Sequence, residues 1–163
     1  MHGLNFEDSR RKAPGSLCDD PAASEVLAAL ARGAGLSDAL ERFPRAGTLR
    51  ERLERARYLM APMAGVSDAA YRMMARAGGA GLAYSEMVSV AGIHYEGEKT
   101  WDLVIPRDPE PDLAVQLFGS KPDQFREAAA QVSERLGDRL ALIDINMACP
   151  VPKVTKKGEG PAL

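Results

Sequence analysis

One segment late in the sequence brings together residue types that could do chemistry. A short apolar run ends at Asn146, and Cys149 and Lys153 follow it among two prolines, Pro150 and Pro152. The run predicts a buried strand, and the prolines stop that strand and stiffen the turn after it. The amide, the thiol and the amine therefore lie at or just beyond the C-terminal end of one strand, where α/β barrels place their chemistry.

Three earlier apolar runs carry unusual groups at comparable places. The first ends in Ala61–Gly65, the second ends in Ser85–Met87, and the third holds Gln116. In a parallel barrel all of these groups would face one pocket together with Asn146 and Cys149. Polar groups on apolar strands cost free energy unless they find partners, and a flat polar ligand such as a flavin would supply them.

Each of these residues also has a purely structural interpretation. Pro62 and Gly65 are ordinary turn residues, and a single strand glutamine such as Gln116 more often bonds to a neighbouring backbone group. Taken alone, a cysteine such as Cys149 is more often a small buried apolar residue than a catalyst. The chemical interpretation therefore depends on the whole set and not on any single member.

The pattern along residues 58–146 positions these groups on a parallel sheet. Four apolar runs predict strands, at 58–61, 81–87, 113–118 and 140–146. Helices are predicted at 68–77, which Asp68 caps, and at 122–136, whereas 92–111 is predicted to be a loop. Strands that alternate with helices indicate parallel pairing through crossover connections, so the predicted fold class is α/β.

Residues 1–57 have a different residue pattern from the α/β part of the sequence. Residues 1–20 are polar and irregular, which predicts a loose tail. The residues after that predict helices, the last of which begins with a capping box of Thr48 and Glu51. We therefore expect a tail and a short all-helical extension over 1–57, and a separate α/β part over 58–163.

Bulk composition limits the classes of function. The 163 residues are 45% hydrophobic and carry a formal net charge of -2, so no overall basic field draws the chain to nucleic acid. The two cysteines, Cys18 and Cys149, give no disulfide framework, and no spacing of Cys and His typical of a metal site occurs. No apolar stretch approaches the roughly 18 residues that span a membrane. We expect a cytoplasmic protein that binds neither metal nor membrane.

Four motifs taken together resemble the tRNA-dihydrouridine synthase family, and its bacterial members most closely. The likeness covers about residues 58–163, and the last of the four motifs is quite specific. The motifs are Ala61-Pro62-Met63-Ala64-Gly65-Val66-Ser67-Asp68 with Arg72 following, Ser85-Glu86-Met87, Gln116-Leu117-Phe118-Gly119, and Asp144-Ile145-Asn146-Met147-Ala148-Cys149-Pro150 with Lys153-Val154.

The resemblance implies an FMN-binding TIM barrel followed by a small helical domain, which reduces particular uridines in tRNA to dihydrouridine with NADPH as reductant. By position, Pro62-Met63-Ala64 corresponds to the backbone segment along the flavin ring, and Gln116 corresponds to the amide that bonds the polar edge of that ring. Asn146 corresponds to a contact to the target uracil. Cys149 corresponds to the proton donor.

The chemistry that the resemblance implies is consistent with a thiol on a pocket loop. Hydride from the reduced flavin would add to C6 of the uracil, and the adjacent C5 would then carry enolate-like charge. A thiol can give C5 its proton as a general acid. The uridine would have to leave its stack in the tRNA to reach the flavin. The full-length protein is expected to be a monomer.

Two features depart from the family pattern. Ala148 stands where the family usually has glycine beside the cysteine, and alanine resists backbone angles that glycine allows. A TIM barrel takes roughly 250 residues, whereas about the first four β/α units are visible here. We therefore interpret the chain as the N-terminal part of a barrel, and we expect it to bind FMN weakly or not at all on its own, because a partial barrel has open sheet edges.

Two alternatives stay open at this point. One is a truncated, non-catalytic fragment of such an enzyme, because the sequence stops soon after Cys149. The other is a different FMN barrel, of the dihydroorotate dehydrogenase type, which oxidises a free pyrimidine. The segment Asn146–Pro150 discriminates between these barrels and favours the tRNA enzymes.

Overall fold

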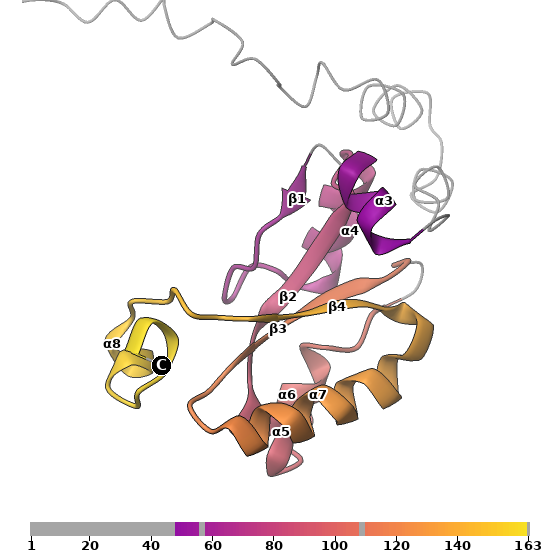
Figure 1. The fold of residues 1–163 in the computed structure, drawn as a ribbon. Helices are drawn as coiled ribbons and strands as arrows, with labels where there is room; N and C mark the ends of the chain where they lie inside the picture. Colours follow the sequence, from indigo (N-terminus) through magenta and orange to yellow (C-terminus); the bar gives the residue numbers. More distant parts are fainter. Residues whose placement is uncertain (1–47, 56–57, 108–109, 163) are drawn as a thin grey trace, which may run out of the picture.

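A computed structural model describes residues 48–55, 58–107 and 110–162 of the chain. The tail and most of the helical extension that the sequence predicts, together with Cys18, lie outside these described residues. Figure 1 shows the described chain as one sheet with helices packed beside it.

The helix α3, Leu49–Arg55, begins as the sequence predicts. The backbone N–H of Thr48 donates to the carboxylate of Glu51 at 2.7 Å, and the N–H of Glu51 donates to the hydroxyl of Thr48 at 3.3 Å. These reciprocal hydrogen bonds are those of a capping box, which satisfies two N–H groups that a helix start leaves without partners.

Four parallel strands form one sheet in their order along the chain. The strands are β1 Leu59–Met60, β2 Leu82–Ser89, β3 Leu113–Phe118 and β4 Leu140–Ile145. The register pairs Met87 with Gln116 and Gln116 with Asp144, so these three side chains share one face of the sheet. The predicted α/β architecture with a parallel sheet is confirmed. The extent of a TIM barrel stays a prediction.

Two helices connect strands as predicted. The helix α4, Ala69–Ala77, lies between β1 and β2, and α7, Pro122–Leu136, lies between β3 and β4 with the short 3-10 helix η3, Gly137–Arg139, after it. Asp68 caps α4, because its carboxylate accepts the N–H of Tyr71 at 2.8 Å. Among the described helices, none is long and apolar enough to cross a membrane.

The prediction of a loop over 92–111 is wrong in part. Two short helices occupy this stretch, α5 at Val90–His94 and α6 at Glu98–Asp102. The hydroxyl of Ser89 caps α5 by accepting the N–H of Gly92 at 3.3 Å, and the buried Trp101 anchors α6 on the core. Helices of five residues contain too few turns for a 3.6-residue apolar period to reveal them.

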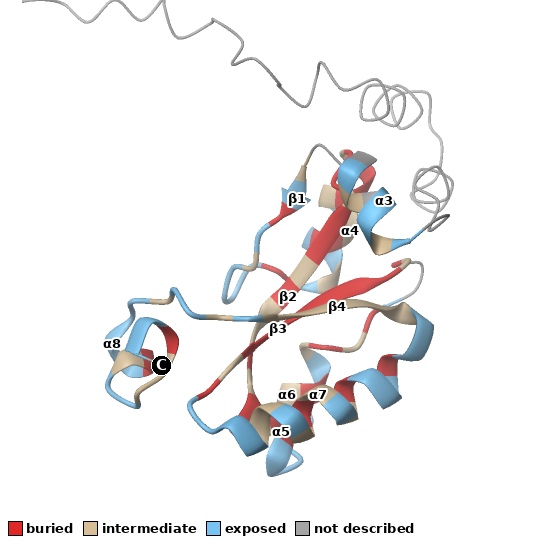
Figure 2. Ribbon diagram, in the orientation of Figure 1, coloured by how far each residue is buried: buried red, intermediate tan, exposed pale blue. Residues whose placement is uncertain are grey.

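The main hydrophobic core lies between one face of the sheet and the helices. Figure 2 shows buried residues along β2, β3 and the inner side of α7, with exposed residues on the outer side of α7. This face is called the helix-covered face below. Its core residues include Val88, Leu113, Val115 and Leu117 from the strands and Ala128, Val132 and Leu136 from α7.

Two buried ion pairs tie α4 to the segment that leads into β3. The guanidinium of Arg72 donates to both carboxylate oxygens of Glu110, at 2.6 and 2.8 Å, and Arg76 donates to Asp112 at 2.7 Å. Both pairs lie almost wholly out of contact with solvent. Buried charges are tolerated when they are paired and hydrogen-bonded in this way.

Candidate active site

The loop after β1 carries Pro62-Met63-Ala64, the segment that the family resemblance places along a flavin ring, and side chains hold its backbone. The N–H of Met63 donates to the hydroxyl of Ser67 at 2.7 Å, and the N–H of Gly65 donates to the carboxylate of Glu86 at 2.6 Å. Gly65 has a φ of 75°, a left-handed conformation that favours glycine. Ser67 follows the loop and Glu86 lies on β2, so the loop is fixed from two sides.

The buried ion pair of Arg72 and Glu110 supports this loop through Ser67. A further N–H of Arg72 donates to the backbone oxygen of Ser67 at 2.8 Å, and Ser67 in turn accepts from Met63. The N–H of Ser67 closes the turn by donating to the backbone oxygen of Met63 at 2.9 Å. The position of the loop therefore depends on an ion pair that lies in the interior of the fold.

A chain of side-chain amides crosses the other face of the sheet. The Nε2 of Gln116 donates to Asp144 at 2.6 Å, and the Nδ2 of Asn146 donates to the Oε1 of Gln116 at 2.9 Å. The same Nδ2 lies 2.9 Å from the sulfur of Met87. Gln116 is only 7% exposed, and this set of Met87, Gln116, Asp144 and Asn146 is called the amide network below.

Asn146 connects the amide network to the loop that holds Cys149. Its Oδ1 accepts the backbone N–H of Ala148 at 3.1 Å and that of Cys149 at 3.0 Å. Such a bond from an asparagine to backbone groups two and three residues on fixes a turn. The N–H of Asn146 donates to the backbone oxygen of Leu117 at 2.9 Å, which ties the loop to β3.

The short helices after β4 support the same loop from the other side. They are α8, Pro152–Thr155, and the 3-10 helix η4, Gly160–Ala162. Gly160 has a φ of 64°, and a Cβ atom there would lie 2.8 Å from the carbonyl oxygen of Cys149. Gly160 therefore lets the backbone of η4 approach Cys149 closely. The Cys149 side chain is half-buried and forms no disulfide.

Ala148 fits its position without strain. Among the residues that the structure describes, Glu96 is the one non-glycine residue with a positive φ, so the backbone at Ala148 is not left-handed. The alanine in place of the usual glycine therefore costs no backbone strain in this loop.

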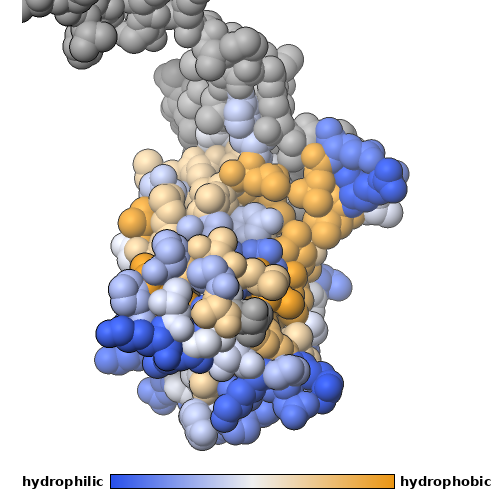
Figure 3. Space-filling view, turned by 60° about the vertical axis from the view of Figure 1, so that its left-hand side comes forward, coloured by the Kyte–Doolittle hydropathy of each residue, from blue (hydrophilic) through white to orange (hydrophobic). Residues whose placement is uncertain are grey.

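Exposed apolar side chains surround the site. The large apolar side chains of four residues on or beside the loops after β1 and β4 are exposed, namely Met63, Ile145, Met147 and Val151. Figure 3 shows apolar side chains gathered on one side of the molecule, with hydrophilic side chains below them. Apolar residues around a few fixed polar groups are typical of a site for a flat organic ligand.

Tyr84 lies on β2 near the amide network. Burial raises the pKa of Tyr84 above its ordinary value of 10.0, and the negative charge of Asp144 raises that pKa further. The phenol therefore stays neutral across the physiological range.

The structure brings Gln116, Asn146 and Cys149 into one hydrogen-bonded system. That these residues share one pocket with Pro62–Ala64 stays a prediction. The roles of Asp144 and Glu86 were missed, although both lie inside the quoted motifs. A signal for Asp144 was available, because residues two apart on a strand share a face and Asn146 is two residues on. The contact of Glu86 with Gly65 joins β2 to the loop after β1 and has no such signal.

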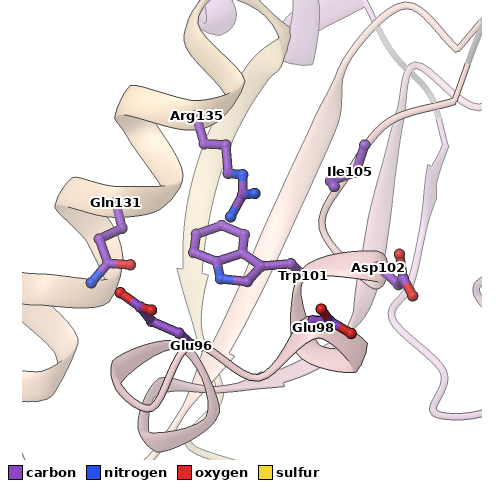
Figure 4. A pocket seen from close by; sticks show the side chains of 7 residues that line it. All are labelled: Glu96, Glu98, Trp101, Asp102, Ile105, Gln131 and Arg135. Carbon is purple, nitrogen blue, oxygen red and sulfur yellow. The ribbon is translucent and has the colours of Figure 1, made fainter.

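A hollow lies among the helices, away from the amide network. It has a volume of about 600 Å³ and lies between α6, α7 and the turn before α6. Figure 4 shows Arg135 reaching over Trp101, with the carboxylates of Glu96 and Glu98 nearby. The guanidinium carbon of Arg135 lies 4.3 Å from the centre of the Trp101 ring, so a cation of the chain itself already occupies the aromatic face. We assign the candidate site to the strand ends.

No group of three or more His, Cys, Asp or Glu in the described part of the chain could hold a metal ion. The polar groups at the strand ends are instead amides, a thiol and backbone N–H groups. This donor set suits an organic ligand with hydrogen-bonding edges.

Comparison with known proteins finds relatives that are named tRNA-dihydrouridine synthases. The chain is 38% identical over 110 residues to the probable tRNA-dihydrouridine synthase 1 of Synechocystis sp., a stretch that covers 66% of this chain and 30% of that protein. It is 37% identical over 103 residues to the probable tRNA-dihydrouridine synthase of Treponema pallidum, covering 63% of this chain and 30% of the relative.

A third relative is tRNA-dihydrouridine synthase B of Escherichia coli, with 38% identity over 109 residues that cover 67% of this chain and 33% of the relative. The chain therefore spans about a third of the length of the curated relatives that it matches. The family model described as dihydrouridine synthase matches residues 59–163, which contain all four motifs and the whole candidate site. The chain belongs to the dihydrouridine synthase family.

Proposed function

We propose that this chain supplies part of the active site for the FMN-dependent reduction of uridine to 5,6-dihydrouridine in tRNA, with NADPH as reductant. Membership of the family and the names of the relatives support the reaction and the tRNA substrate. The observation that carries the proposal is the fixed position of Cys149. Its loop is held by Asn146, which is itself bonded to Gln116 on the next strand.

The residues present fit a flavin ring. Gln116 has two hydrogens on Nε2 and, within the described structure, uses one of them on Asp144, so the other is available to a ring carbonyl or nitrogen. The segment Pro62–Ala64 is partly exposed and its turn is already fixed, so its backbone can contact a ligand without further ordering. Gln116 and Pro62-Met63-Ala64 would therefore hold FMN.

Cys149 supplies the proton in this proposal. Bound FMN, reduced by NADPH, supplies the hydride that adds to C6 of the uracil. The Cys149 S–H then gives its proton to C5 as a general acid, and the thiolate regains a proton from water. The bonds from Asn146 to the Ala148 and Cys149 amides hold the thiol in place during this step.

Asn146 contacts the uracil by exchanging one partner. Both hydrogens of its Nδ2 are in use, one on Gln116 and one on the sulfur of Met87. A thioether is a weak acceptor, so a uracil carbonyl can replace Met87 at little cost while Asn146 keeps its bonds to Gln116 and to the Cys149 loop. The apolar side chains of Met63 and Met147 then contact the faces of an extruded base.

A transplantation experiment tests the proposed function. Residues 59–162 replace the matching segment of the Escherichia coli relative, and dihydrouridine in tRNA is measured by mass spectrometry in cells that lack the native enzyme. We expect the chimera to form dihydrouridine and its Cys149→Ala variant to lose about a hundredfold or more in rate, because a general acid contributes at least that much. The matched control is Ala148→Gly, which restores the usual family residue and keeps activity.

Flavin absorbance of the purified chimera and its variants separates folding from chemistry. A chimera that holds flavin but forms no dihydrouridine contradicts the proposed reaction. Undiminished activity of the Cys149→Ala chimera contradicts the role of Cys149 as proton donor.

A further inference from the structure

We propose that Asp144 is a positioning residue, which sets the direction of the side-chain amides of Gln116 and Asn146 and thereby holds the Cys149 loop. The inference rests on the proposed function for its catalytic meaning. Its structural content stands on the hydrogen bonds that run from Asp144 to the backbone N–H of Cys149.

The Asp144 carboxylate sets the orientation of the Gln116 side-chain amide. An ionised aspartate accepts hydrogen bonds and has none to give, whereas the two ends of a glutamine amide are chemically different but similar in size. The contact with Asp144 at 2.6 Å is therefore favourable only when the Nε2 of Gln116 points toward it. The Oε1 of Gln116 must then point toward Asn146.

The orientation of the Gln116 amide in turn sets the orientation of the Asn146 amide. The Oε1 of Gln116 needs a donor, and among the described residues the Nδ2 of Asn146 supplies it at 2.9 Å. With Nδ2 on that side, Oδ1 faces the Cys149 loop and accepts two backbone N–H groups. If Asn146 turned over, its NH₂ group would face those two donors and both bonds would be lost.

Because Gln116 is buried, a reversed orientation of its amide is energetically costly. Gln116 is almost fully buried, so water does not readily satisfy a reversed amide. An unsatisfied buried donor or acceptor costs more than an ordinary hydrogen bond gains. The negative charge on Asp144 thus selects one of two nearly isosteric arrangements.

Hydrogen exchange of the backbone amides, measured by NMR on the full 163-residue chain, tests the inference. In Asp144→Asn the new side-chain amide can face Gln116 with either end, so the direction is no longer set. We expect exchange at the Ala148 and Cys149 amides to accelerate about five- to tenfold, the loss that one hydrogen bond brings. Asp123→Asn, which removes an exposed carboxylate from α7, is the matched control and leaves both amides unchanged.

A second background separates orientation from mere structural support. In Asn146→Asp both terminal atoms are oxygens, so the side chain can accept from the Cys149 loop in either orientation. We expect Asp144→Asn to produce no acceleration at the Cys149 amide in this background. Equal acceleration in both backgrounds means that Asp144 supports the sheet in general and overturns the inference, as does the absence of any change in the parent background.

A third variant covers the case in which Asp144→Asn does not fold. Gln116→Leu interrupts the amide network in the middle with an apolar side chain of similar size, and we expect it to accelerate exchange at the Cys149 amide to the same degree. Unchanged exchange in this variant overturns the inference. The measurement uses neither flavin nor tRNA, so its failure is distinguishable from failure of the dihydrouridine assay.

Discussion

The two faces of the sheet hold the chain together by different means. On the helix-covered face, apolar residues such as Val115 and Leu117 pack against α7. The buried charges between α4 and the segment before β3 are bonded to one another in pairs. On the opposite face, the partly exposed Met87 and Asp144 and the buried Gln116 meet in the amide network. The first face fixes where the strands lie, whereas the second fixes which way polar groups point.

The difference has an energetic consequence. Burial of apolar area stabilises a fold without direction, at about 25 cal/mol per Å². A hydrogen bond adds only about 1 kcal/mol net to stability, but it depends strongly on the direction of donor and acceptor. Substitutions on the helix-covered face should therefore act mainly on the free energy of unfolding, and those on the amide network mainly on the geometry around Cys149.

The largest loss of stability is expected from Arg72→Met. The change leaves the carboxylate of Glu110 buried without its bidentate partner, which should lower the free energy of unfolding by about 3–5 kcal/mol in urea denaturation. The double variant with Glu110→Leu should recover much of this loss, because an apolar pair can replace a buried ion pair. A double variant as unstable as the single one would show that the packing of the Arg72 chain, and not its charge, is what matters.

A matched pair on β3 tests the comparison between the faces directly. Leu117 and Gln116 are neighbours in sequence that point to opposite faces. Leu117→Ala removes part of the core and should cost about 3 kcal/mol. Gln116→Leu should cost about 1 kcal/mol, because the partners that lose hydrogen bonds, Asp144 and Asn146, are partly exposed and can bond to water instead. Urea denaturation gives both values, and similar losses for the two variants would contradict the division of roles between the faces.

Those structural features that depend on a local sequence pattern can be predicted from the sequence. The capping box of Thr48 and Glu51, the cap at Asp68 and the strand over Leu113–Phe118 each depend on neighbours in sequence, and each is confirmed. The short helix that contains Trp101 was predicted to be loop, because five residues show no period.

The parts of the site that were missed depend on contacts between separate elements. Glu86 contacts Gly65 from the next strand, and Arg72 contacts Glu110, which is far away in the sequence. The spacing of residues within a short stretch of sequence therefore predicts neither contact. The grouping of Gln116 and Asn146 was predictable because parallel strands end at one edge. Their direct bond depends on the register of β3 and β4, which an apolar run does not specify.

The smallest effect is expected from the one perturbed phenol near the amide network. The folded chain holds the pKa of Tyr84 above the value of 10.0, chiefly through burial and then through Asp144. Above that pH the unfolded chain loses the proton first, so stability that is fully present below it should decline as the pH rises toward the folded-state value. Urea denaturation at about pH 8 and about pH 11 should show a smaller decline for Tyr84→Phe than for the parent chain. Tyr71→Phe is the exposed control and should decline like the parent. If Tyr84→Phe also declines like the parent, the burial of the Tyr84 phenol beside Asp144 contributes nothing measurable to the pH dependence of stability.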